Sequence, residues 1–141
     1  MRLLLAPMEG LLDDVLRATI TRTGGYDYAV SEFARVSGTL LPDRFFRRIA
    51  PELDHASRTP CGTEVRVQLL GSDPQCMAAN AVRLARLRPA GIDLNFGCPA
   101  REVTGAQCGS ALLREPALAA ALLRAAVEAV DVPVTVKMRL G

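Results

Sequence analysis

The chain alternates short runs of apolar residues with longer stretches in which apolar residues recur at helical spacing. We interpret the short runs as strands, at residues 3–6, 28–33, 65–70, 92–95 and 134–139. Helices are expected at 13–23, 73–89 and 116–131, with shorter ones before Ile49 and within 105–114. Alternating strands and helices predict a parallel sheet that is covered by helices.

Local signals support the expected helices. Asp13 or Asp14 and the pair Asp73–Pro74 are typical of helix starts, and Gly24–Gly25 is typical of a helix end. In the second helix, one face is expected to be buried. Its members are Ala78, Ala81, Val82 and Ala85.

The pattern fits two architectures, a doubly wound sheet and a (β/α)8 barrel. The continuous apolar runs are typical of strands that are covered on both faces. A complete barrel takes about 250 residues, whereas this chain has 141 and reaches its fifth strand just before its end. We therefore interpret residues 1–141 as one incomplete domain, the N-terminal portion of a TIM (β/α)8 barrel with about five of the eight strands.

Composition narrows the possibilities further. Half of the residues are hydrophobic and 23% are charged, which excludes a disordered chain. The formal charge of +2 is far from the excess of a dedicated nucleic-acid-binding module, although an RNA partner stays possible. The start of the chain has neither a signal peptide nor a membrane-length apolar run, so we expect a cytoplasmic protein that does not enter a membrane.

The cysteine pattern argues against a metal site. The four cysteines form no CxxC pair, and the chain has a single histidine. Zinc sites usually combine closely spaced cysteines and histidines. We therefore expect free thiols and no bound metal.

Polar residues follow the expected strands at their carboxyl ends, where chemistry takes place in such folds. We expect these side chains to converge on one ligand. They are Pro7, Met8 and Glu9 after the first strand, Arg35 after the second, Gln68 in the third, Asn95 and Cys98 at the fourth, and Lys137 and Arg139 at the fifth.

Cys98 is the sharpest candidate, because it lies in the tight turn Gly97–Cys98–Pro99 directly after a strand. It is either a small buried hydrophobic residue or a reactive thiol, and position alone favours neither. A free thiol is mostly protonated near neutral pH. It could act as a general acid, or as a nucleophile beside a cation. The other cysteines lack this setting, and we interpret them as bystanders.

Lys137 is the only lysine of the chain and lies within an apolar strand. It could form an ion pair inside the barrel with Glu32 or Asp93, or it could face an anionic ligand or cofactor. Gln68 could bind the edge of a heterocycle, but alone it is better read as a satisfied core amide. For Asn95 the two interpretations are equally good.

Three other features carry weaker signals. The glycine-containing stretch 105–110 could bind phosphate, but it matches no known phosphate-loop pattern. His55 is more typical of a solvated loop than of a catalytic site. The arginines 44, 47 and 48 lie near Phe45 and Phe46; an RNA-facing patch is conceivable, but a solvated helix face is the better interpretation.

Five motifs in this order and spacing resemble the bacterial tRNA-dihydrouridine synthases. They are LLAPMEG, SEFAR ending in Arg35, VRVQLLG, DLNFGCP and VTVKMRLG. The resemblance covers the chain from Arg2 to Gly141. The stretches 51–53 and 56–60, together with Arg35, look most like the C-type subfamily, which acts on uridine 16.

The resemblance implies an FMN-dependent TIM barrel followed by a helical tRNA-binding domain, with NADPH as the reductant. Cys98 would protonate C5 of uracil while the flavin delivers hydride to C6. Pro7, Met8 and Glu9 would line the flavin, and Gln68 and Lys137 would bind its ring. Asn95, Arg35 and Arg139 would contact the flipped uridine or the tRNA near it.

The chain departs from the family pattern after Gly105, where Gln107–Cys108 replace further glycines. The resemblance also implies further barrel strands and a helical domain that these 141 residues do not include. We therefore expect these 141 residues alone to bind FMN weakly and to have little activity. The full-length protein is expected to be a monomer, whereas the fragment could self-associate through its open fifth strand.

Two other functions stay open. A flavin-dependent dehydrogenase of a free pyrimidine shares a similar Asn-x-x-Cys-Pro turn, usually with serine where this chain has Gly97. Reduction of free uracil rather than tRNA would identify it. The second alternative is a truncated, non-catalytic association domain, which size measurement and FMN absorbance would identify.

Overall fold

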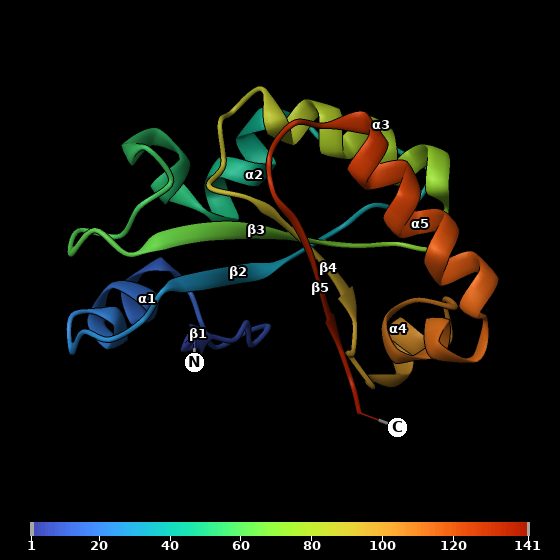
Figure 1. Ribbon diagram of the computed structural model, residues 1–141, viewed down its shortest axis with the longest axis horizontal. Coiled ribbons are helices and arrows are strands. Elements are labelled where there is room, and N and C mark those ends of the chain that lie inside the picture. Colours follow the sequence, from blue (N-terminus) through green and yellow to red (C-terminus); the bar gives the residue numbers. More distant parts are fainter. Residues whose placement is uncertain (1, 141) are drawn as a thin grey trace.

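The computed structural model describes residues 2–140; Met1 and Gly141, the last residue of the VTVKMRLG motif, lie outside the described residues. The fold is a curled, parallel five-stranded sheet with helices around it (Figure 1). The strands are β1 (Leu4–Leu5), β2 (Tyr28–Arg35), β3 (Glu64–Leu70), β4 (Ile92–Phe96) and β5 (Val134–Met138).

The strand order decides between the two predicted architectures. The strands lie side by side in sequence order, β1-β2-β3-β4-β5, and every neighbouring pair is parallel. A doubly wound sheet reverses direction at a switch point, whereas a barrel adds each strand on the same side. The predicted N-terminal part of a TIM barrel is therefore confirmed.

The helices begin where the sequence predicts. Asp13 accepts a hydrogen bond from the Leu16 N–H, and Asp73 accepts one from the Cys76 N–H, so both aspartates are N-caps. The helical segments are α1 (Asp14–Thr21), α2 (Asp43–Ile49), η1 (Pro51–His55), α3 (Pro74–Ala85), α4 (Arg101–Thr104), η2 (Gly109–Arg114) and α5 (Pro116–Ala129).

One predicted helix face is partly wrong. Val82 of α3 is 37% exposed, whereas Met77, Asn80 and Leu84 are buried together with the predicted Ala81. The larger side chains Met77 and Leu84 turn toward the sheet. Asn80 is buried because its amide binds the loop before α2, donating to the carbonyl of residue 39 and accepting the N–H of residue 41.

The two faces of the sheet differ in character. Alternate residues such as Val67, Leu69 and Leu94 pack against the helices in the main hydrophobic core. The residues between them point to the inner face of the sheet and are polar. Register places Gln68 opposite Asp93, Asp93 opposite Thr135, and Asn95 opposite Lys137. The inner face can therefore form hydrogen bonds across strands.

A buried ion pair joins the first helix to the segment after α2. The guanidinium of Arg17 in α1 forms two hydrogen bonds of 2.8 Å with the carboxylate of Glu52 in η1, and the two side chains are 0% and 7% exposed. Arg17 also donates to the carbonyls of Leu12 and Ile49. The pair thus has the additional hydrogen bonds that a buried charge needs.

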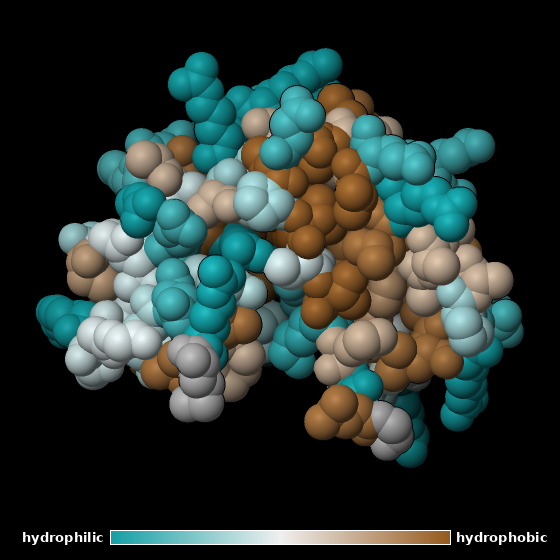
Figure 2. Space-filling model, in the orientation of Figure 1, coloured by the Kyte–Doolittle hydropathy of each residue, from teal (hydrophilic) through white to brown (hydrophobic). Residues whose placement is uncertain are grey.

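The sheet has edges at β1 and β5. Figure 2 shows apolar side chains gathered over β5 and the adjoining part of α5. Val127 and Met138 in these elements are 50% and 58% exposed. Within residues 2–140, no helix combines the length and the apolar character needed to cross a membrane.

Candidate active site

A hollow of about 170 Å³ opens at the carboxyl ends of the strands, where the sequence predicts the site. Seven of the nine predicted residues line it, and Met8 and Arg35 do not. Phe33, Gly97 and Pro99 complete the lining. The predicted members are Pro7, Glu9, Gln68, Asn95, Cys98, Lys137 and Arg139.

Two predicted residues lie outside the lining of the hollow. Met8 is 42% exposed, and its carbonyl accepts the N–H groups of Leu11 and Leu12. Arg35 is half-buried at the end of β2 and donates a 3.4 Å hydrogen bond to the Glu102 carbonyl. Arg35 lies close enough to Glu9 to act on its carboxyl group electrostatically.

The turn that carries Cys98 is held by the side chain of Asn95. The Oδ1 atom of Asn95 accepts the N–H of Gly97 at 3.0 Å and the N–H of Cys98 at 2.9 Å. The Nδ2 atom donates to Oε1 of Gln68 at 2.9 Å. Gln68 and Asn95 are therefore satisfied buried amides and line the hollow at the same time.

Lys137 does not form an ion pair with the described residues inside the barrel, one of the two arrangements that its position in the sequence allows. Its side chain is exposed, and within residues 2–140 it makes no salt bridge with Glu32 or Asp93. Glu32 instead accepts the backbone N–H of Gly10. A Cβ placed on Gly97 would lie 3.8 Å from Nζ of Lys137, so the ammonium group lies beside the turn of Cys98. Thiol and ammonium thus line the same hollow.

Two further contacts fix the turn from outside. Arg139 donates through Nε to the Gly97 carbonyl at 2.7 Å, which ties the end of β5 to the end of β4. The carbonyl of Cys98 accepts the Ser110 N–H at 2.9 Å. Gly109 has a positive φ of 60°, and a Cβ there would come within 2.5 Å of the Cys98 carbonyl oxygen. A glycine at this position therefore permits η2 to pack against the turn.

Two carboxyl groups near the site have raised pKa values. Burial raises the pKa of Glu9, the charges of Glu102 and Glu32 raise it further, and Arg35 opposes them. Burial also raises the pKa of Asp93, against hydrogen bonds from Thr135 and Gln68 and the charges of Arg66 and Lys137. Both groups are thus easier to protonate than free carboxyl groups.

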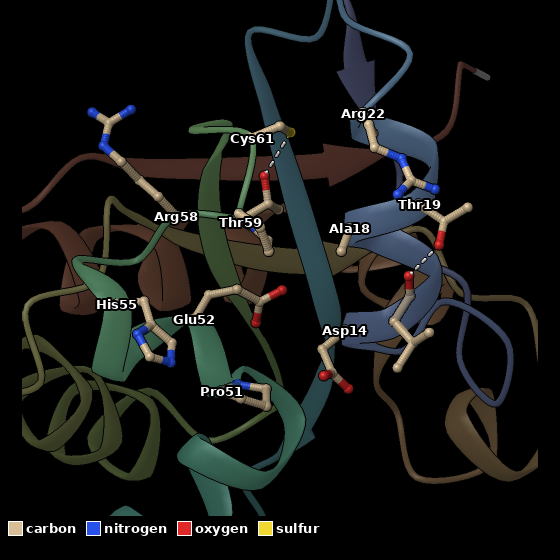
Figure 3. Close-up of a pocket in the computed structure, with 12 residues that line it drawn as sticks. Asp14, Ala18, Thr19, Arg22, Pro51, Glu52, His55, Arg58, Thr59 and Cys61 are labelled. Atoms are coloured by element: carbon tan, nitrogen blue, oxygen red, sulfur yellow. Dashed lines mark hydrogen bonds between the residues drawn. The ribbon is translucent and has the colours of Figure 1, made fainter.

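A second, larger pocket of about 770 Å³ lies between α1 and η1 (Figure 3). Cys61 stands at one end of it, and hydrogen bonds with Thr21, Thr59 and Thr63 lower the pKa of its thiol to about 6. Cys61 does not line the hollow at the strand ends, so its interpretation as a bystander to that site stays a prediction, but its lowered pKa was not expected from the sequence. Sequence reasoning missed it because Thr21 lies far from it in the chain.

The residues for which the sequence gives weaker functional signals do not line the hollow. His55 lines the second pocket and is exposed. Arg47 pairs with Asp54 at 2.7 Å, and Arg48 lies over the ring of Phe45 at 4.8 Å. These contacts agree with the predicted solvated helix face.

The donor set of the hollow suits a polar heterocycle rather than a metal. Lys137 supplies a cation, and Gln68 and Asn95 supply amide groups. Within the described residues, no group of three or more histidine, cysteine or acidic side chains could hold a metal ion. Pockets for drug-sized ligands measure about 300–1,000 Å³. At about 170 Å³ the hollow is smaller than such pockets and matches the size of one edge of a ring system.

Comparison with known proteins gives one family for this chain, from a family profile and from individual relatives. Residues 4–141 match the sequence profile of the family described as dihydrouridine synthase (Dus). The chain is 52% identical to a tRNA-dihydrouridine(16) synthase of Aquipseudomonas alcaligenes over 143 residues, which cover 100% of this chain and 45% of that protein. The corresponding proteins of Salmonella typhimurium (strain LT2) and Escherichia coli (strain K12) are 53% and 52% identical over 144 residues, covering all of this chain and 46% and 45% of theirs. The chain thus spans less than half the length of these curated relatives.

Proposed function

The chain belongs to the dihydrouridine synthase family, and on that premise we propose that it is the N-terminal part of a flavin-dependent tRNA-dihydrouridine(16) synthase. This enzyme would reduce the C5–C6 double bond of uridine 16 in the D-loop of tRNA. The observation that carries the proposal is the hollow at the carboxyl ends of the strands, where the Cys98 thiol, the Lys137 ammonium and two fixed amides face one space.

FMN is the proposed cofactor, with NADPH as its reductant. When bound, FMN would supply the hydride chemistry needed at C6 of uracil. Lys137 and Gln68 would bind the ring of the cofactor, and Pro7, Met8 and Glu9 would line it. Support comes from the donor set, since a cation and an amide are groups that can bind such a ring and tune its electronics. Met8 is the weakest member, because it does not line the hollow.

Cys98 is the proposed catalytic residue. Addition of hydride to C6 leaves negative charge that a proton at C5 must neutralise, and a neutral thiol can donate that proton. The fixed turn supports this role, because Asn95, Arg139 and Ser110 all bind its backbone, whereas within residues 2–140 no hydrogen bond engages the thiol. The ammonium of Lys137 beside the turn would stabilise negative charge that develops there.

Recognition of tRNA would involve Arg35, Asn95 and Arg139. C5 of a paired or stacked base is inaccessible, so the target uridine must leave its stack at a cost of about a few kcal/mol. Bases in single-stranded loops are the easier targets. Arg139 lines the hollow and is suited to the nucleotide beside Cys98. Arg35 lies outside that lining and is suited to the RNA backbone nearby.

The small volume of the hollow also affects what we expect of the isolated polypeptide. We expect residues 1–141 alone to bind FMN weakly, to have little activity and to self-associate through the exposed edge at β5. The complete enzyme would be a cytoplasmic monomer. A chimera that joins the chain to the remaining part of the Escherichia coli relative should recover FMN binding.

The experiment that tests the proposal offers the chimera FMN, NADPH and tRNA from a strain that lacks dihydrouridine. We expect dihydrouridine at position 16 and no reduction of free uracil. Reduction of free uracil instead of tRNA would identify a pyrimidine dehydrogenase. If FMN is bound and reduced but neither dihydrouridine nor reduced uracil forms, the result would contradict a catalytic function.

A further inference from the structure

We propose that Asp93 is a positioning residue that fixes the turn of Cys98 through Gln68 and Asn95. Asp93 is 4% exposed on the inner face of β4 and does not line the hollow. Its importance for catalysis rests on the proposed function of Cys98. Its effect on the turn follows from the hydrogen bonds alone.

The first step is the contact between Asp93 and Gln68. The Oδ2 atom of Asp93 accepts a hydrogen bond of 2.7 Å from Nε2 of Gln68, and its Oδ1 atom accepts one of 2.6 Å from Thr135. An ionised carboxylate only accepts hydrogen bonds. Gln68 must therefore turn its NH2 group toward Asp93, and this determines which way the amide of Gln68 faces.

The second step passes this orientation to the turn. Because the NH2 group of Gln68 donates to Asp93, its Oε1 atom faces Asn95. That oxygen accepts a hydrogen bond from the NH2 group of Asn95. The Oδ1 atom of Asn95 is then directed at the N–H groups of Gly97 and Cys98. A flip of either amide would bring two donors or two acceptors together. The carboxylate therefore selects one arrangement of the whole chain of hydrogen bonds.

Two cations face Asp93 from the neighbouring strands. Arg66 on β3 is 8% exposed, its Nε atom has no hydrogen-bond partner within the described residues, and its guanidinium lies 3.9 Å from the ring centre of Tyr28. Lys137 lies on β5. A Cβ on Gly91 would come within 3.1 Å of the Arg66 side chain, so the glycine leaves room for this cation. Arg66 and Lys137 favour the ionised, accepting form of Asp93.

The first test needs no substitution. In the isotopically labelled chain, NMR follows the side-chain amides of Gln68 and Asn95 and the backbone N–H of Cys98 from acidic to neutral pH. We expect all three signals to move with the midpoint of the Asp93 carboxyl group. A Cys98 signal that does not follow the Asp93 midpoint would overturn the proposal.

The second test compares three variants by residue-resolved hydrogen exchange. Asp93→Leu removes the acceptor and should speed exchange at the amides of Gly97 and Cys98 by about tenfold. Asp93→Asn should restore slow exchange, because its oxygen can accept from Gln68 while its NH2 donates to the Thr135 hydroxyl. Thr135→Val is the matched control, since it removes the other hydrogen bond of Asp93, and it should leave both amides unchanged.

The Val67 amide, which donates to the Gly91 carbonyl, reports general loosening of the sheet. Equal acceleration of Val67 and Cys98 in Asp93→Leu would overturn a positioning role. If Asp93→Leu does not fold, the NMR titration of the unsubstituted chain still tests the proposal. Neither readout requires catalysis, so a failure of the proposed function would appear separately, as an absence of dihydrouridine.

Discussion

Asn95 binds the backbone of Cys98 directly: its Oδ1 atom accepts the Cys98 N–H at 2.9 Å. The same oxygen accepts the N–H of Gly97, so one side chain closes the turn at the end of β4. In the proposed reaction the thiol must meet one carbon atom of a base, and a fixed backbone matters there because misplacement by about 1 Å can cost a hundredfold in rate. The placement of Cys98 thus depends on a residue three positions earlier.

The first prediction concerns Asn95→Ala. The substitution leaves the buried N–H of Gly97 and the part-buried N–H of Cys98 without their acceptor, and we expect the folded chain to lose about 1–3 kcal/mol of stability. Dihydrouridine formation by the chimera should fall by about a hundredfold. Denaturant unfolding and a tRNA assay measure the two effects. Unchanged activity would show that the turn keeps its geometry without Asn95.

The second prediction concerns the buried ion pair of Arg17 and Glu52. Glu52→Gln leaves the arginine charge buried without its partner, and we expect a loss of about 3–5 kcal/mol in the free energy of unfolding. Asp54→Asn is the matched control. It breaks an ion pair of similar length between side chains that are 43% and 54% exposed, and no measurable change is expected. Equal losses in the two variants would contradict the role of burial.

The third prediction concerns the reactivity of Cys61. Three threonine hydroxyl groups lower the pKa of its thiol to about 6, so alkylation of Cys61 should reach half its maximal rate near that pH. Thr59→Val removes a hydroxyl group that can donate to the thiolate and should move the midpoint upward. Mass spectrometry of iodoacetamide-labelled peptides measures the rates. A midpoint near that of an ordinary thiol in the unsubstituted chain would be incompatible with this cluster.

The fourth prediction concerns pH and stability. The folded state raises the pKa of Asp93 from 3.8, mainly through burial, so the folded chain holds this proton at pH values where the unfolded chain has released it. The contribution of Asp93 to stability therefore falls as pH rises from 3.8 through the raised value. Asp93→Asn should lack this decline. The check is the difference between the two unfolding free energies across the pH range; a constant difference would contradict the raised pKa.

Much of the fold was predictable because its signals are local. The caps at Asp13 and Asp73 and the apolar strand runs depend on neighbouring residues, and the structure confirms them. The exposed Val82 was not predictable from spacing alone, because the burial of Asn80 depends on hydrogen bonds to a loop that lies about forty positions away.

The residues of the candidate site also divide into those that the sequence pattern predicts and those that it does not. The hollow unites residues at strand ends, which a parallel sheet brings to one edge, so seven of nine predictions lie there. The cluster at Cys61 and the link from Asp93 to Cys98 join residues on different elements. Such contacts depend on register and side-chain direction, which the residue pattern does not determine.

The most direct test of the account is dihydrouridine formation by the chimera with Cys98→Ala, compared with Cys61→Ala. We predict that Cys98→Ala still binds FMN and accepts electrons from NADPH but loses most of its tRNA product, by about a hundredfold or more. Cys61→Ala should form dihydrouridine at the rate of the unsubstituted chimera. Full product formation by Cys98→Ala would show that another group donates the proton and would contradict the central claim.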